Sequence, residues 1–168
     1  MKVKLASGIS LLLIAGSSDD GQRNANADRL SAPTYYIAAR ARTCAPDVIN
    51  AFGVSNLPAG SLLSLEVSEF DDNAWREYSP TTHVALDREG YFAASIKPSG
   101  GKRFRQNLLL VVRFATYDPR QPSGVLNELG PRGEKLVATD NPQAEQVSGP
   151  NYVLETIARV PFCGNPQP

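Results

Sequence analysis

The sequence predicts an all-β fold: a single antiparallel β-sandwich of seven strands, immunoglobulin-like or related, with a long crossover before the last strand. Seven runs of the chain place apolar residues mostly at every second position, as strands with one buried face do. The 168 residues include 13 glycines and 13 prolines, a content that favours frequent turns over a helix bundle. Hydrophobic residues make up 42% and charged residues 20%, which predicts a folded domain with one modest core.

Residues 1–27 are expected to be a signal peptide, which leaves 28–168 as the single domain. Lys2 and Lys4 precede an apolar run at 5–15, which is too short to cross a bilayer as a helix. Small residues suit cleavage after Ala27 or after Ser17, and both sites stay open. The mature chain is therefore expected outside the cytoplasm, periplasmic or secreted, without a membrane span.

The predicted strands are separated by strong turn signals. They are residues 35–43, 48–54, 62–70, 82–86, 91–97, 107–117 and 152–160. The run at 62–70 alternates apolar and polar residues, so it should bury one face. The run at 108–112 is apolar throughout and should lie centrally, covered on both sides. Turns are expected at 56–60, 87–90 and 98–101.

The crossover before the last strand holds five prolines and four glycines between Tyr117 and Tyr152. Within it Ser123 is placed to cap a short helical turn that carries apolar residues, and Gly130 is placed to end it. This segment should plug an edge of the sandwich. Long connections are often functional, so a partner site here and a solvated crossover are weighed equally.

Cys44 and Cys163 are predicted to form a disulfide, because export would expose them to oxidising conditions. They are 119 positions apart, so the bridge would close nearly the whole domain and stabilise it by roughly 4 to 5 kcal/mol. Two alternatives are a pair of buried thiols in a cytosolic protein, and a cysteine nucleophile with His83 as its base.

The chain resembles a group of small exported bacterial β-sandwich domains. The resemblance lies in residues 48–67, around the turn Asn56-Leu57-Pro58-Ala59-Gly60-Ser61, where such proteins have Asn-Leu-Pro-x-Gly followed by Thr or Ser. A second similar stretch contains Gln121-Pro122, Val125, Gly130, Gly133, Glu134 and Leu136. The resemblance implies a fold and carries no activity or catalytic residues.

The residue inventory argues against catalysis and against a cofactor or metal. One histidine and two cysteines do not make a structural zinc site, and neither a serine-hydrolase elbow nor a phosphate-binding loop is present. Equal numbers of basic and acidic residues, 17 each, give no general attraction to nucleic acid or membrane. A small carbohydrate-active enzyme stays an alternative through paired carboxylates among Glu66, Glu69, Asp71, Asp72 and Glu77.

Two groups of residues are candidates for contact with a partner. Trp75, Tyr78 and His83 follow an acidic cluster at 69–73, which is itself a weak calcium-loop candidate. Arg103, Phe104 and Arg105 follow a Gly-Gly turn that Lys97 and Lys102 flank, and Phe104 would supply an aromatic ring for stacking. The alternatives are that Trp75 closes the core and that the basic residues are a solvated hairpin tip.

We therefore expect a non-catalytic binding or structural module that contacts a protein or a cell-envelope component. A second hypothesis is an inhibitor of an extracytoplasmic hydrolase, which would insert an extended loop at 118–124 into the foreign active site.

Overall fold

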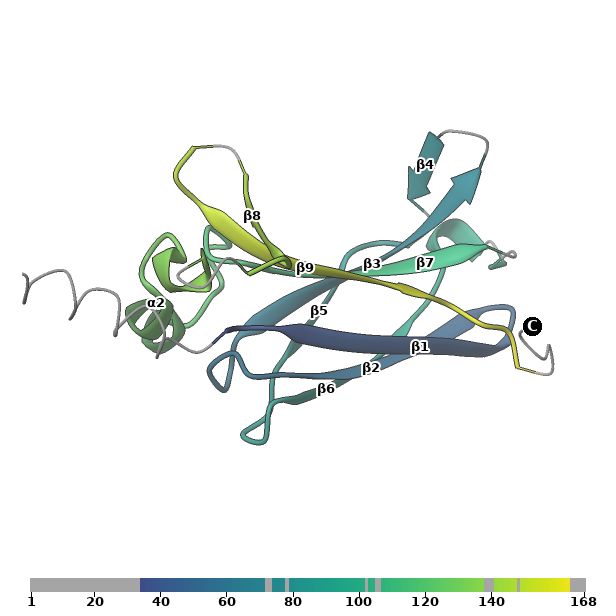
Figure 1. Ribbon diagram of the computed structural model, residues 1–168. Helices are drawn as coiled ribbons and strands as arrows, with labels where there is room; N and C mark the ends of the chain where they lie inside the picture. The colour runs from purple at the N-terminus through teal and green to yellow at the C-terminus, as the bar shows by residue number, and fades with distance from the viewer. Residues whose placement is uncertain are drawn as a thin grey trace, which may run out of the picture. The chain divides into compact units, whose positions relative to one another are not determined.

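The structure, a computed structural model, describes residues 34–71, 74–77, 79–101, 103–104, 107–137, 141–147 and 149–163. The predicted signal peptide lies outside these residues. The described chain is mostly β, and its strands form two antiparallel sheets that pack face to face as a sandwich (Figure 1). The predicted sandwich is therefore confirmed.

The smaller sheet has the order β1-β2-β6, from Ile37–Ala45, Val48–Ser55 and Tyr91–Ile96. The larger sheet has the order β4-β3-β7-β9-β8, from Ala74–Glu77, Leu62–Asp71, Leu108–Ala115, Tyr152–Arg159 and Ala144–Gln146. A further strand, β5 (Thr82–Ala85), pairs with the first half of β3, and β4 pairs with its second half. β4 and β5 thus share one edge of the larger sheet.

All seven predicted runs form strands, but the predicted number is too low, because β4 and β8 are also present among the described residues. These two strands have four and three residues and lack the apolar alternation on which the prediction rests. Pairing with the neighbouring β3 and β9 makes them strands.

The apolar run at 108–112 lies in β7, which is central as predicted, between β3 and β9. The prediction that both its faces are covered is wrong. Leu108, Leu110, Val112 and Phe114 are buried, whereas the side chains between them are partly exposed. β7 therefore contributes only one face to the core.

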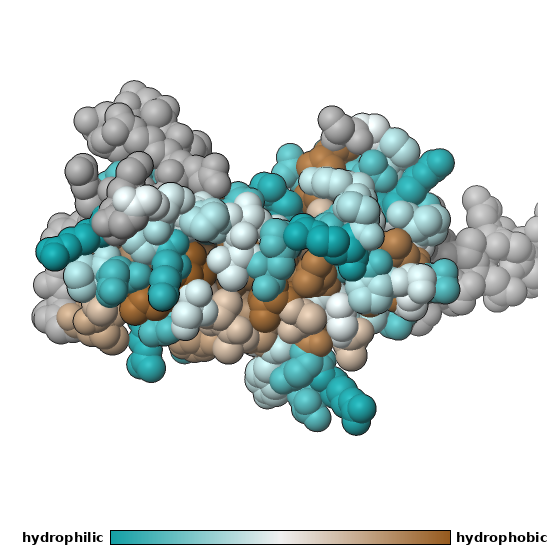
Figure 2. Space-filling view, turned by 180° about the vertical axis from the view of Figure 1, so that it is seen from behind, coloured by the Kyte–Doolittle hydropathy of each residue, from teal (hydrophilic) through white to brown (hydrophobic). Residues whose placement is uncertain are grey.

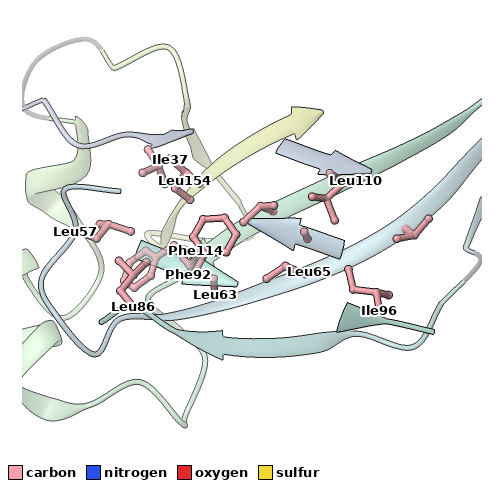
Figure 3. Packing of buried hydrophobic residues seen from close by; sticks show 14 of the residues in the cluster. Ile37, Leu57, Leu63, Leu65, Leu86, Phe92, Ile96, Leu110, Phe114 and Leu154 are labelled. Atoms are coloured by element: carbon pink, nitrogen blue, oxygen red, sulfur yellow. The ribbon is translucent and has the colours of Figure 1, made fainter. Parts of the chain in front are cut away.

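The core fills the space between the two sheets with the inward side chains of each. Figure 3 shows Phe92 and Ile96 from the smaller sheet facing the same interior as Leu65 and Phe114 from the larger one. On the face in Figure 2, much of the hydrophobic surface lies in a broken band across the middle of the molecule, among hydrophilic residues. The apolar residues at every second position of the strands thus face inward from both sheets and form one core between them.

The crossover closes one end of the sandwich (Figure 1). Its helix α2 (Ser123–Leu129) and the 3-10 turn η2 (Glu134–Val137) add Val125, Leu129 and Leu136 to the core. The predicted helical turn and its end at Gly130, with φ 87°, are confirmed. The predicted cap is wrong: Pro122 is the N-cap residue and α2 begins at Ser123, with no side-chain capping bond.

The smaller and larger sheets are joined at the end of β1. The backbone N–H of Thr43 donates to Pro161 at 3.0 Å, and that of Cys163 donates to Thr43 at 2.8 Å. Beside these bonds Cys44 and Cys163 form the predicted disulfide, with their Cα atoms 4.8 Å apart. The bridge therefore ties the first strand to the segment after the last one.

At the other end of β1 a side chain takes the place of a neighbouring strand. The Gln143 amide accepts a hydrogen bond from the Ile37 N–H at 2.9 Å and donates one to the Ile37 carbonyl at 2.9 Å. The Asn141 amide donates to the Tyr35 carbonyl. The crossover thus satisfies backbone groups on the outer edge of β1.

A search of the described residues finds no helix that is long and apolar enough to cross a membrane.

Loss of the disulfide should lower the free energy of unfolding by about 4 to 5 kcal/mol, because the bridge closes a loop with a sequence separation of 119. Denaturant unfolding of the wild-type protein with and without reductant measures this difference. The Cys44→Ala/Cys163→Ala variant is the control and should not respond to reductant. A difference below about 1 kcal/mol would contradict the entropic role of the bridge.

Gly53→Ala should destabilise the sandwich by about 1 to 3 kcal/mol, since a Cβ at this position would lie 2.2 Å from the Ala38 carbonyl oxygen and 2.5 Å from the Phe92 ring. Gly124→Ala is the matched control, because nothing lies within 4 Å of its Cβ position in α2. That change should stabilise by up to about 1 kcal/mol. Equal effects in thermal unfolding would show that close packing at Gly53 is unimportant.

Candidate functional site

The structure does not bring the predicted partner residues together. His83 lies on β5 opposite Ser64, whereas Trp75 lies on β4 opposite Phe70, so the two occupy different halves of β3. Tyr78 and Arg105 lie outside the described residues, as does the side chain of Trp75. Arg103 is exposed.

Phe104 requires a correction. We expected its ring at an exposed hairpin tip, but it is only 4% exposed and belongs to the core cluster. Its backbone N–H donates to the Pro46 carbonyl at 2.7 Å, which holds the segment against the β1–β2 turn. Burial of the ring outweighs the polar character of its neighbours, so Phe104 is a packing residue here.

Around His83 the outer face of the larger sheet carries a depression of about 500 Å³, which we call the polar groove. It is lined by Ser64, Glu66, Thr81, His83, Arg113, Ala115, Tyr117, Asp118, Pro119 and Arg120. Strand register creates it: His83, Ser64 and Arg113 stand opposite one another on β5, β3 and β7. Glu155 of β9 continues this row beside Arg113.

An ion pair fixes the middle of the groove. Arg113 donates from Nε to a Glu155 carboxylate oxygen at 2.8 Å, and its Nη2 bonds to the same oxygen. Burial disfavours the charged guanidinium, but the hydrogen bond and charge of Glu155 outweigh burial and raise the pKa of Arg113. The guanidinium therefore stays charged and held in place.

A second ion pair connects the turn after β7 to β5. The Arg120 guanidinium donates to both Asp118 carboxylate oxygens, at 2.9 and 2.7 Å, and its Nη2 lies 2.6 Å from His83 Nε2. Arginine can only donate, so a hydrogen bond here has Nε2 of His83 as its acceptor. The Arg120 hydrogen bond outweighs partial burial and lowers the pKa of Asp118.

Gln121 positions this turn. Its buried amide accepts from the Leu62 N–H at 3.0 Å and donates to the Leu62 carbonyl at 2.8 Å and the Ala115 carbonyl at 3.2 Å. The Gln121 N–H also closes the turn onto the Asp118 carbonyl at 3.0 Å. Residues 118–124 are therefore a clamped turn leading into α2, and not the extended loop that the inhibitor hypothesis expected.

The candidate carboxylates do not form a described pair. Glu66 accepts a hydrogen bond from the Thr81 hydroxyl at 3.0 Å, at the side of the groove. Asp72 lies outside the described residues, as do the side chains of Asp71 and Glu77. Within the described part of the chain, no group of three or more His, Cys, Asp or Glu residues is arranged to hold a metal ion. The calcium and glycosidase hypotheses stay predictions.

The fold and the groove define a β-sandwich with a polar surface depression. No family model matches the chain, and comparison with curated proteins and with solved structures gave no match. The resemblance to exported bacterial β-sandwich domains therefore stays a prediction.

The carboxyl of Asp118 should titrate below the usual range for aspartate, and Arg120→Ala should move its midpoint upward. Since the pKa is lowered in the folded state, its contribution to stability is present above the unfolded value of about 3.9 and is lost as pH falls through the folded value. Carboxyl NMR titration measures both midpoints. Arg132→Ala, a change of an exposed arginine outside the groove, is the control and should leave the Asp118 midpoint unchanged.

Proposed function

We propose that this protein is a non-catalytic binding module that works outside the cytoplasm and contacts a protein or a cell-envelope component through the polar groove. The observation that carries this proposal is the fixed state of the polar side chains in the groove. Arg113 is held by Glu155, Arg120 by Asp118 and the turn itself by Gln121. A surface whose rotamers are already fixed loses little entropy when a partner binds.

The groove has the side-chain types that dominate protein interfaces. Tyr117 is 52% exposed at its rim, and the two arginines stand beside it. Tyrosine and arginine are enriched among residues that contribute most to binding energy. The groove therefore favours a protein as the partner.

The same contacts support binding over catalysis. His83 Nε2 faces the Arg120 guanidinium, so it is not free to take a proton from a substrate. The nearest hydroxyl on β3, that of Ser64, donates to the Arg113 carbonyl at 3.3 Å. The cysteine nucleophile that was considered with His83 is not favoured, because Cys44 and Cys163 are joined in a disulfide.

We also propose that the sandwich is immunoglobulin-like, and the strand order supports this. The sheets β1-β2-β6 and β3-β7-β9 follow the A-B-E and C-F-G order of immunoglobulin domains. The chain departs from antibody domains in its disulfide, which joins β1 to the segment after β9 rather than the B and F strands. Export rests on the apolar run at 5–15 and on the disulfide, since such bridges persist mainly outside the cytoplasm.

Photo-crosslinking in the native cell tests the proposal. A crosslinking amino acid at position 117 should give adducts of defined mass, whereas the same group at exposed Glu145 on β8 should not. Arg120→Ala combined with the position 117 crosslinker should reduce the adducts severalfold, because the turn loses its ion pair. Equal adducts at both positions, or none at position 117, would refute the groove as the contact surface.

A further inference from the structure

The outer face of the smaller sheet is a second, chemically different surface. Strand register places three rows of side chains across it: Ala38–Val54–Tyr91, Arg40–Phe52–Ala93 and Arg42–Asn50–Ser95. A shallow depression of about 440 Å³ lies over the first two rows. We call these three rows the outer face.

Aromatic rings stand exposed on the outer face. Phe52 is 42% exposed and Tyr91 59%, and Tyr36, at the start of β1, is also 42% exposed. The core does not require them, because the opposite side of the same strands carries the buried residues Ile49, Ala51 and Phe92. Outward positions on a solvated sheet are normally polar, so exposed rings on adjacent strands indicate a contact surface.

The charges on the outer face are all of one sign. Arg40 and Arg42 are two residues apart on β1 and point to the same side, about 7 Å apart along the strand. Neither guanidinium group makes a hydrogen bond or ion pair with any residue that the structure describes, and none of the three rows contains an acidic side chain. Within the described residues the face therefore has two positive charges beside its rings and no acidic partner for them, which complements an anionic ligand.

We propose that the outer face binds an acidic polysaccharide, with its carboxylates paired to Arg40 and Arg42 and its sugar rings packed on Phe52 and Tyr91. Guanidinium groups bind carboxylates through two parallel hydrogen bonds. The C–H groups on the face of a sugar ring pack against the electron-rich face of an aromatic ring. This site lies on the opposite sheet from the polar groove and does not depend on it.

Other anionic or self-complementary partners fit less well. A second copy of the chain, docked face to face, would bring two more arginines and no acidic side chain from the three rows to pair with them. A nucleic acid is bound mainly through many phosphate contacts, and two arginines on a formally neutral chain supply few. An extended peptide would add to a strand edge, but the outer edge of β1 is occupied at Ile37 and at Thr43.

Titration calorimetry with the protein as it is isolated from its native cells tests the proposal. A polyuronate oligosaccharide is the probe, and neutral dextran is the comparison. The polyuronate should bind and dextran should not. Arg40→Ala should weaken binding about tenfold to a hundredfold, as expected for loss of a charge-assisted pair. Phe52→Leu should weaken binding severalfold, whereas Phe52→Tyr, which keeps the ring, should retain the affinity.

Matched controls lie away from the outer face, on β9 and in the turn after β7. Arg159→Ala and Tyr117→Ala change an exposed arginine and an exposed tyrosine outside the outer face, and both should leave polyuronate affinity unchanged. Thermal unfolding confirms that each variant is folded. No binding tighter than about 1 mM, equal binding of dextran, or tighter binding of polyglutamate or an oligothymidylate would overturn the proposal. Since the crosslinking experiment at position 117 tests the groove separately, failure at either surface is distinguishable from failure at the other.

Discussion

The attachment of β1 at both of its ends is the constraint on which the sandwich depends. The named strands pair within their own sheet, so the two layers are held together by apolar packing and by a few hydrogen bonds outside the ladders. Gln143 bonds both backbone groups of Ile37, and Pro161 and Cys163 do the same for Thr43. The disulfide at Cys44 makes the second attachment covalent. Packing is non-directional, whereas these bonds fix how one sheet lies on the other.

The features that could be predicted are those with a local signal. The apolar pattern is sufficient to predict seven of the strands, and two cysteines in a chain with an export pattern are sufficient to predict their pairing. The amides of Gln143 and Gln121 carry no such signal, because their partners are 106 and 59 positions away. Phe104 misled the prediction for the same reason: its neighbours are polar, and only the folded chain shows that its ring is covered.

The groove was predictable only in part. His83 was selected because it is an amphipathic side chain near Trp75, yet the structure groups it with Asp118 and Arg120 instead. A usable signal was present in Asp118-Pro119-Arg120, since an aspartate before proline typically accepts from the backbone two residues later, as Asp118 does here at 3.0 Å. That signal predicts the turn. It does not predict that the turn returns to β5, because strand register decides which side chains meet.

The polar groove contains paired charges, whereas the outer face contains positive charges alone. This difference follows from the strands on which the charged residues lie. The row of side chains that forms the groove runs across four strands, β5, β3, β7 and β9. A cation and an anion therefore stand on neighbouring strands and pair, as Arg113 and Glu155 do. The smaller sheet is three strands wide, and Arg40 and Arg42 lie on its edge strand, opposite Phe52 and Asn50. Their lateral neighbours within that sheet are uncharged, so no anion on a neighbouring strand pairs with them. The same backbone alternation thus produces an internally satisfied surface on one layer and an unsatisfied one on the other.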